Sequence, residues 1–162
     1  MKAISKINNT LAKIEGAVMV FWFAIVLVVM TCQVVSRYIF NAPIAWSEEF
    51  ARYSFVWISY IGCAYCVSVD AHTGITAFRD ALPPKARKLT TVLGNVVVMI
   101  VFIRLLPIAM KFIGKNSKFL TSMMRIPFKY LYYSLPVGCV LTVVHLILKS
   151  ILLFAPDTIE KA

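Results

Sequence analysis

Charged residues are scarce in this chain of 162 residues, and acidic residues are the scarcest of them. Asp, Glu, Lys and Arg together make up 15% of the sequence, and Asp and Glu number only 7. A soluble domain has about 25% charged and about 45–50% apolar residues, whereas 60% of this chain is apolar. The composition therefore argues against a soluble enzyme. Because disorder requires low hydrophobicity, it also argues against a disordered protein.

The shortage of acidic residues leaves a formal net charge of +10, from 17 Lys and Arg. In a soluble protein this excess would suggest a nucleic-acid partner. Here the mean hydropathy is +0.82, so the anionic lipids of a membrane are the better partner for the cations. We predict contact with membrane lipids and no nucleic-acid partner.

Several chemical motifs are also absent. The sequence has no Gly-rich phosphate loop, no nucleophile paired with a base and no cluster of metal ligands, so we predict no cofactor and no enzymatic activity. The long apolar runs contain no acidic residue. A cation-coupled carrier usually holds its ions with carboxylates or broken helices near the membrane midplane. These absences favour an accessory membrane subunit.

Four apolar runs fill much of the chain, and each approaches the roughly 20 residues that span a bilayer as a helix. We predict spans at about 16–36, 53–69, 87–110 and 130–149. Backbone polar groups in lipid must be satisfied within the segment, so the predicted fold class is an all-α integral membrane protein. Residues 1–162 then form a single four-span domain. The first run is longer than a cleaved signal sequence, and we interpret it as a retained signal anchor.

The segments beside the spans carry apolar stripes at helical spacing. We predict short amphipathic helices lying in the membrane interface at about 2–15, 42–53 and 71–82. In the second of these, Ser47 is expected to cap the helix. Glu48 and Glu49 then fall in its first turn, where the helix dipole favours anions. Further along, Pro84 suits the first turn of the third span, and Pro136 should bend the fourth near its start.

The distribution of Lys and Arg gives the orientation. With four spans, the side that holds both termini carries more cations than the other side. We therefore predict a multi-pass protein of the bacterial inner membrane with both termini in the cytoplasm. The third loop argues the other way, because it has five basic and no acidic residues. Its basic residues are Lys111, Lys115, Lys118, Arg125 and Lys129.

Two residue types have both a functional and a structural interpretation. Cys63 and Cys66 form a C-x-x-C motif, which is a redox pair in thiol oxidoreductases. They also lie with small neighbours on one helix face, which favours close packing, and we prefer this interpretation. His72 and His145 are the only histidines and would have to pair to hold haem or zinc. For His145 we favour a packed residue with an interhelix hydrogen bond, and for His72 an interfacial residue beside Asp70.

Apart from Arg87, Lys88 and Lys149 at the ends of their spans, Arg104 is the one charged residue inside a predicted span. An ionisable residue within the membrane is a functional candidate by default, and here it would form a buried ion pair with another helix or with another subunit. Its position near the end of the span also allows its long side chain to carry the charge to the interface. Both interpretations, the second of them favoured, stay open at this point.

Residues 37–72 read RYIFNAPIAWSEEFARYSFVWISYIGCAYCVSVDAH. This stretch resembles the small, DctQ-like membrane subunit of tripartite ATP-independent periplasmic (TRAP) transporters. Later residues, Ile126-Pro127 and Tyr133 through Gly138, resemble the same family, as do the length and the four-span layout. The residues that carry the resemblance in the first stretch are Arg37, Tyr38, Pro43, Trp46, Glu48, Glu49, Arg52, Trp57, Gly62, Asp70 and His72.

The resemblance implies two protein partners. One is a large, M-type membrane subunit with the substrate and sodium sites, and the other is a periplasmic protein that captures an organic anion. The substrate would be a carboxylate of the sialic-acid or C4-dicarboxylate type. This subunit would then anchor and enlarge the static scaffold of the large one.

Two further hypotheses concern charged residues. Glu48, Glu49 and Arg52 would pair with each other, with Arg37, or with the large subunit, or else remain solvated. The basic third loop would steer an acidic binding protein onto the membrane complex, or else contact lipid headgroups. The alternative from another class is a four-span thiol oxidoreductase that uses Cys63 and Cys66.

Overall fold

The computed structural model describes residues 2–69 and 83–153. Its elements are α1 (Lys2–Ile39), α2 (Ser47–Ser68), α4 (Pro84–Asn116), α5 (Lys129–Tyr132) and α6 (Ser134–Leu153). Within these ranges the one β feature is an isolated bridge between Leu120 and Pro127. The predicted all-α fold class is therefore confirmed. Asp70, His72 and the predicted helix at 71–82 lie outside the described residues.

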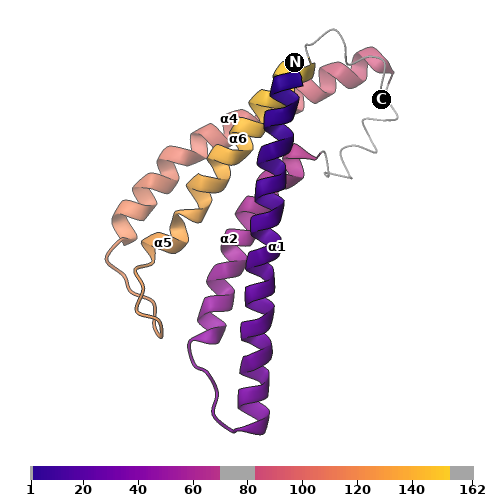
Figure 1. The fold of residues 1–162 in the computed structure, drawn as a ribbon. Coiled ribbons are helices and arrows are strands. Elements are labelled where there is room, and N and C mark those ends of the chain that lie inside the picture. The colour runs from indigo at the N-terminus through magenta and orange to yellow at the C-terminus, as the bar shows by residue number, and fades with distance from the viewer. Residues whose placement is uncertain (1, 70–82, 154–162) are drawn as a thin grey trace.

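The long helices run alternately up and down, so that Lys2 and the end of α6 lie at one end of the bundle (Figure 1). The connections at 40–46 and 117–128 lie at the other end. α6 packs against α1, α2 and α4, and most extensively against α2. α6 is therefore the central helix of the bundle.

Three helical stretches have the length and apolar composition to cross a membrane: Ile4–Ile39, Leu89–Asn116 and Lys129–Leu152. α2 does not meet this criterion, because it begins with Glu48, Glu49 and Arg52 and contains several serines and tyrosines. Its 22 residues extend about 33 Å at 1.5 Å per residue, close to the thickness of about 30 Å of the hydrocarbon core. The crossing predicted for 53–69 stays a prediction.

α1 is a single helix of 38 residues, so nothing separates the predicted interfacial helix at 2–15 from the predicted span at 16–36. The face of α1 that is turned inward here is formed by Asn8, Ala12 and Glu15, all of them buried. Ile7 and Ile14, from the apolar stripe of the sequence, are 51% and 56% exposed. The buried face of the first turns of α1 is thus largely polar, and these two residues of the apolar stripe lie away from it.

The predicted helix at 42–53 is wrong in its first part. Residues 42–46 are not helical, and α2 begins at Ser47 and continues unbroken into the predicted second span. Ser47 is not the N-cap, since its hydroxyl donates a hydrogen bond to the carbonyl of Ile44 (2.7 Å). Glu48 and Glu49 do lie in the first turn, as predicted. The amide oxygen of Gln33 accepts the Ile44 N–H (2.6 Å) and holds the connection to α1.

Prolines mark the starts of the later helices. Pro83 is extended and α4 begins at Pro84, as predicted, although α4 continues to Asn116 rather than ending near 110. The predicted fourth span is divided at Tyr133 into α5 and α6. Pro136 has no N–H to donate to the preceding turn. The break near the start of this span therefore has the cause predicted from the sequence, which is Pro136.

α2 and α6 approach most closely at Gly138. A Cβ atom at this position would lie 2.8 Å from Cβ of Tyr60 and 3.0 Å from its carbonyl oxygen. Only glycine leaves room for such a crossing of two backbones. The contact fixes the first turns of α6 against the middle of α2.

Candidate functional site

At the end of the bundle with the two connections, Glu49 binds the third loop. Its Oε1 accepts the Ser122 N–H (3.0 Å) and the Tyr53 hydroxyl (2.8 Å). Its Oε2 accepts the N–H groups of Met123 (2.9 Å) and Met124 (2.7 Å). Three successive backbone N–H groups that converge on one anion form a nest, a favourable environment for a carboxylate. α2 and the loop are thereby joined over more than 70 residues of sequence.

The loop has its own internal order. The N–H of Thr121 donates to the carbonyl of Ile126, and the N–H of Phe128 donates to that of Phe119, both at 2.9 Å. The hydroxyl of Thr121 accepts the Ile126 N–H (3.0 Å). Arg125 closes the turn with a φ of 51°, in the left-handed region that few non-glycine residues adopt. The loop is therefore a small closed hairpin, and Glu49 holds its tip.

The protonation of Glu49 follows from these contacts. Burial is the largest single influence and raises the pKa of the carboxyl group. The hydrogen bonds from Met124, Tyr53, Met123 and Ser122 together outweigh it, so that the pKa of Glu49 lies below its usual value of 4.5. Glu49 is therefore an anion at neutral pH, as the nest requires.

Sequence reasoning placed Glu49 correctly in the first turn of α2 but not its partners. The predicted pairing of Glu48 or Glu49 with Arg37 or Arg52 does not occur among the described residues, where the one acid–base pair within salt-bridge distance is formed by Glu15 and His145. Glu48, Arg37 and Arg52 are exposed. No residue pattern marks the nest in advance, because backbone N–H groups carry no residue-type signature.

The five basic residues of the third loop gather at the same end. Lys111 and Lys115 are exposed on the last turns of α4, and Lys118 and Arg125 are exposed in the loop. Lys129 begins α5, and its Nζ lies 5.2 Å from the centre of the Tyr130 ring. Docking of a binding protein on this surface stays a prediction.

The remaining candidates lie on separate elements. Trp46 precedes α2, is 45% exposed and makes an edge contact with Phe50 at 6.1 Å. Trp57 is half-buried on α2, and Arg104 is exposed on α4. Arg104 makes no ion pair within the part of the chain that the structure describes, and both interpretations of this residue stay predictions.

A second polar cluster lies toward the opposite end. His145 of α6 is fully buried, and its Nδ1 and Nε2 lie 2.7 Å from Oδ1 of Asn8 and 3.0 Å from Oε1 of Glu15. Each ring nitrogen therefore has a hydrogen-bond partner, and which nitrogen donates depends on the tautomer of His145 and on the rotation of the Asn8 amide.

The cluster confirms the preferred interpretation of His145 as an interhelix hydrogen-bonded residue. The sequence analysis missed Asn8 and Glu15, because a boundary carboxylate beside an apolar run reads as a solvated flank. One turn further on, the Lys149 Nζ donates to the Val67 carbonyl (2.5 Å) and joins α6 to the end of α2. The described residues include no group of three or more metal-ligating side chains.

The cysteines do not form a disulfide. Cys63 and Cys66 are half-buried one turn apart on α2, Cys32 is exposed on α1, and Cys139 is buried on α6. The first three belong to helices that pack against each other, and Cys139 follows the Gly138 crossing. Their placement agrees with the packing interpretation of the C-x-x-C motif.

Comparison with known proteins gives consistent matches. Residues 16–155 match the family model described as "Tripartite ATP-independent periplasmic transporters, DctQ component". The sialic acid TRAP transporter small permease protein SiaQ of Vibrio cholerae is 33% identical over 88% of this chain and 81% of its own length. The sialic acid TRAP transporter permease protein SiaT of Haemophilus influenzae is 26% identical over 87% of this chain, a stretch that makes up 22% of that protein. The C4-dicarboxylate TRAP transporter small permease protein DctQ of Vibrio cholerae is 26% identical over 52% of this chain and 37% of its own length.

Proposed function

Because this chain belongs to the DctQ component family of tripartite ATP-independent periplasmic transporters, we propose that it scaffolds and anchors a large membrane subunit during uptake of an organic anion. The uptake would be sodium-coupled and would depend on a periplasmic binding protein. The relatives named for sialic acid and for C4-dicarboxylates both handle carboxylates. The substrate class proposed for the complete system is therefore a carboxylate of one of these types.

The observation that carries the scaffold role is the contrast between the interior and the outer faces of the bundle. The buried carboxylates bind within the chain, Glu49 to the loop and Glu15 to His145. The outer faces of α1 and α4 expose large apolar side chains, among them Val20, Phe21, Leu93, Val97 and Val101. Such faces suit contact with the helices of a companion subunit or with lipid. Ion ligands for transport would then come from the companion.

Copurification with the large subunit tests this role. We expect this chain to bring the large subunit with it from native membranes, and we expect uptake in liposomes only when both subunits and the binding protein are present. Val97→Trp on α4 and Val28→Trp on α1 place the same bulk on two different outer faces. The variant that loses the large subunit identifies the interface. Accumulation of a carboxylate by the lone chain down a sodium gradient would overturn the proposal.

The basic third loop supports a second part of the proposal, that it steers an acidic binding protein onto the complex. Reversing the exposed Lys111, Lys115 and Lys118 to Glu should raise the KM for the loaded binding protein, mostly at low salt, because screening weakens long-range attraction. Reversal of Lys6 and Lys13, exposed at the opposite end, is the matched control. Equal effects of the two sets, or none, would remove the steering role.

The same proposal requires the third loop on the periplasmic side and both termini in the cytoplasm. A cysteine introduced at Ser117, in a variant lacking exposed Cys32, should react with a membrane-impermeant maleimide in cells with a permeabilised outer membrane. A cysteine introduced at Lys6 should react only after the inner membrane is opened. The reverse pattern would invert the orientation and place the loop in the cytoplasm.

A further inference from the structure

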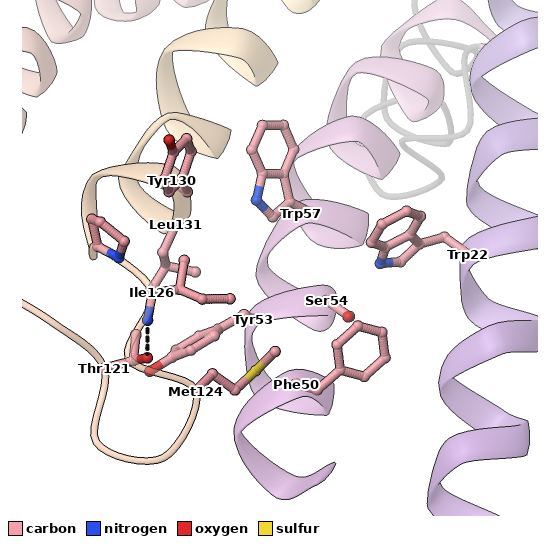
Figure 2. Close-up of a pocket in the computed structure, with 11 residues that line it drawn as sticks. Trp22, Phe50, Tyr53, Ser54, Trp57, Thr121, Met124, Ile126, Tyr130 and Leu131 are labelled. Carbon is pink, nitrogen blue, oxygen red and sulfur yellow. Dashed lines mark hydrogen bonds between the residues drawn. The ribbon is translucent and has the colours of Figure 1, made fainter. Parts of the chain in front are cut away.

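A pocket of about 200 Å³ opens between α1, α2, the third loop and α5. Figure 2 shows its two walls: Trp22 and the α2 residues on one side, and the hairpin with Tyr130 and Leu131 on the other. The lining is almost entirely apolar or aromatic, and it includes Trp22, Phe50, Tyr53, Trp57, Met124 and Tyr130. Its polar members, Ser54 and Thr121, contribute one hydroxyl each.

The shape and lining favour a slender aliphatic occupant. Pockets for drug-sized ligands are about 300–1,000 Å³, so this one is too small for most of them but admits part of a hydrocarbon chain. Trp and Tyr side chains concentrate at the level of lipid headgroups. Two tryptophans and two tyrosines in one lining indicate the depth at which the headgroup and the upper part of an acyl chain meet.

The charges around the pocket select the headgroup. Arg125 lies between the lining residues Met124 and Ile126, and Lys129 precedes the lining residue Tyr130 and lies over its ring. Both cations belong to the segments that form one wall of the pocket, and the surface beside these segments is called the rim here. The carboxylate that reaches this region, Glu49, has both oxygens engaged by loop N–H groups and the Tyr53 hydroxyl. The rim is therefore positive next to an apolar cavity.

We propose that this pocket binds one anionic phospholipid of the bilayer. Part of an acyl chain occupies the aromatic cavity, and the phosphate pairs with Arg125 and Lys129. Lys and Arg side chains close to a membrane surface attract anionic headgroups. An apolar side chain of a companion subunit would fill the cavity equally well but would leave the two cations without a partner, so charge complementarity favours the lipid.

The three tryptophans of the chain provide the test. In a Trp46→Phe variant the two remaining tryptophans both line the pocket. The full chain is reconstituted in phosphatidylcholine vesicles. A small fraction of a lipid with brominated acyl chains is then added, either phosphatidylglycerol or phosphatidylcholine. The bromine atoms quench the fluorescence of nearby indoles. We expect brominated phosphatidylglycerol to occupy the quenching site with about 25-fold preference, because each of the two cations confers about fivefold. Quenching that follows mole fraction alone, equally for both lipids, would overturn the proposal.

Matched variants separate the site from general attraction to the bilayer. Arg125→Gln with Lys129→Gln should abolish the preference, whereas Lys111→Gln with Lys115→Gln, the same loss of charge on α4, should keep it. Equal losses in the two pairs would contradict a defined site. Leu131→Phe should fill the cavity and reduce quenching by both lipids, and Ser54→Leu provides a second filling variant from the other wall. If addition of the copurified large subunit protects both tryptophans from brominated lipid, a protein segment occupies the pocket and the lipid proposal is wrong.

Discussion

Two carboxylates tie the helices together at opposite ends of the bundle, and they do so in different ways. Glu49 is half-buried and accepts four hydrogen bonds, three from backbone N–H groups and one from Tyr53. Glu15 is buried, and its Oε1 meets one nitrogen of His145. Its Oε2 has no hydrogen-bond partner among the described residues, and neither does the buried hydroxyl of Thr142, one turn from His145.

Because of this difference in hydrogen bonding, one carboxylate contributes to the stability of the fold and the other to the specificity of helix pairing. A carboxylate whose lone pairs are satisfied by fixed backbone donors adds stability. A buried ion pair with an unsatisfied oxygen recovers its desolvation cost only in part, and apolar residues of similar size often serve as well. The Glu49 end should therefore be a strong tie. The pair of Glu15 and His145 is best explained as a specificity contact, which selects one pairing of α1 with α6 at a cost in stability.

The largest expected effect comes from separating the buried pair. His145→Leu leaves the Glu15 carboxylate buried without its donor, and loss of one member of such a pair costs about 3–5 kcal/mol. The measurement is the thermal or denaturant unfolding midpoint in detergent, read by circular dichroism.

The double variant Glu15→Leu/His145→Leu is the control, because it removes both members of the buried pair at once. It should recover most or all of the lost stability. A double variant no better than His145→Leu alone would show that the pair contributes net stability, and the contrast with Glu49 would then fail.

The next effect in size concerns the loop end. Glu49→Ala removes the acceptor of three N–H groups and one hydroxyl, and a hydrogen bond to a charged group contributes about 1.5–3 kcal/mol net of exchange with water. We expect a loss of roughly 2–4 kcal/mol together with faster proteolysis of the loop at Lys118 and Arg125. The exposed neighbour Glu48, changed to Ala, should have little effect. Equal sensitivity of the two variants would mean that the nest does not hold the loop.

Acid should weaken the same tie. The pKa of Glu49 is lowered in the folded chain below its usual 4.5, so its contribution is complete above that value and is lost as the pH falls through the lower folded pKa. Loop proteolysis by an acid-active protease should rise in this range in the native chain. In Glu49→Gln the tie is already weakened at neutral pH, so its rate should vary less. Parallel pH profiles would contradict a titrating Glu49.

How far the sequence predicts this structure depends on the kind of interaction. The apolar runs placed α1, α4 and the α5–α6 pair, and Pro84 and the Glu48-Glu49 turn marked helix starts, because these features act locally. The prediction that Ser47 is the N-cap was wrong. A serine that can cap a helix can equally donate back to an earlier carbonyl, as Ser47 does to that of Ile44. Residues 2–15 continue into the first span because the sequence has no breaker at Glu15.

Of the candidate site, the sequence identified Glu49 and His145 but not the residues that these two contact. Glu49 was singled out, but its partners are backbone N–H groups 73 to 75 residues away. His145 was expected to bond across helices, but Asn8 and Glu15 lie 137 and 130 residues away from it. Such pairings depend on how the helices rotate against each other, which the periodicity of each helix alone does not determine. The Gly138 crossing depends on the same rotation.

A smaller effect is expected where neither carboxylate acts. Gly138→Ala places a methyl group against Tyr60 backbone, and overpacking of this kind costs about 1–3 kcal/mol. Gly94→Ala is the matched control, because no atom lies within 4 Å of its added Cβ and Ala is favoured over Gly in helices by about 1 kcal/mol. Unfolding midpoints should shift in opposite directions. If both substitutions stabilise the chain, α2 and α6 are packed less closely at Gly138. The position of α2 must then depend on the hydrogen bonds of Glu49 and of Glu15.

The smallest expected change tests the difference between the two carboxylates most directly, because the same Glu→Gln substitution is made at Glu15 and at Glu49. Glu15→Gln keeps the contact to His145 and removes a buried charge whose second oxygen has no partner among the described residues. Its effect should lie within about 1 kcal/mol of zero, or stabilise the chain. Glu49→Gln leaves one acceptor oxygen and sets an NH₂ donor against N–H groups that also donate, so it must destabilise. Unfolding midpoints of the two variants at neutral pH, measured beside the parent chain, should therefore separate in that order. If Glu15→Gln proves the more damaging of the two, the buried cluster is the stronger tie, and the loop nest only orders a surface segment.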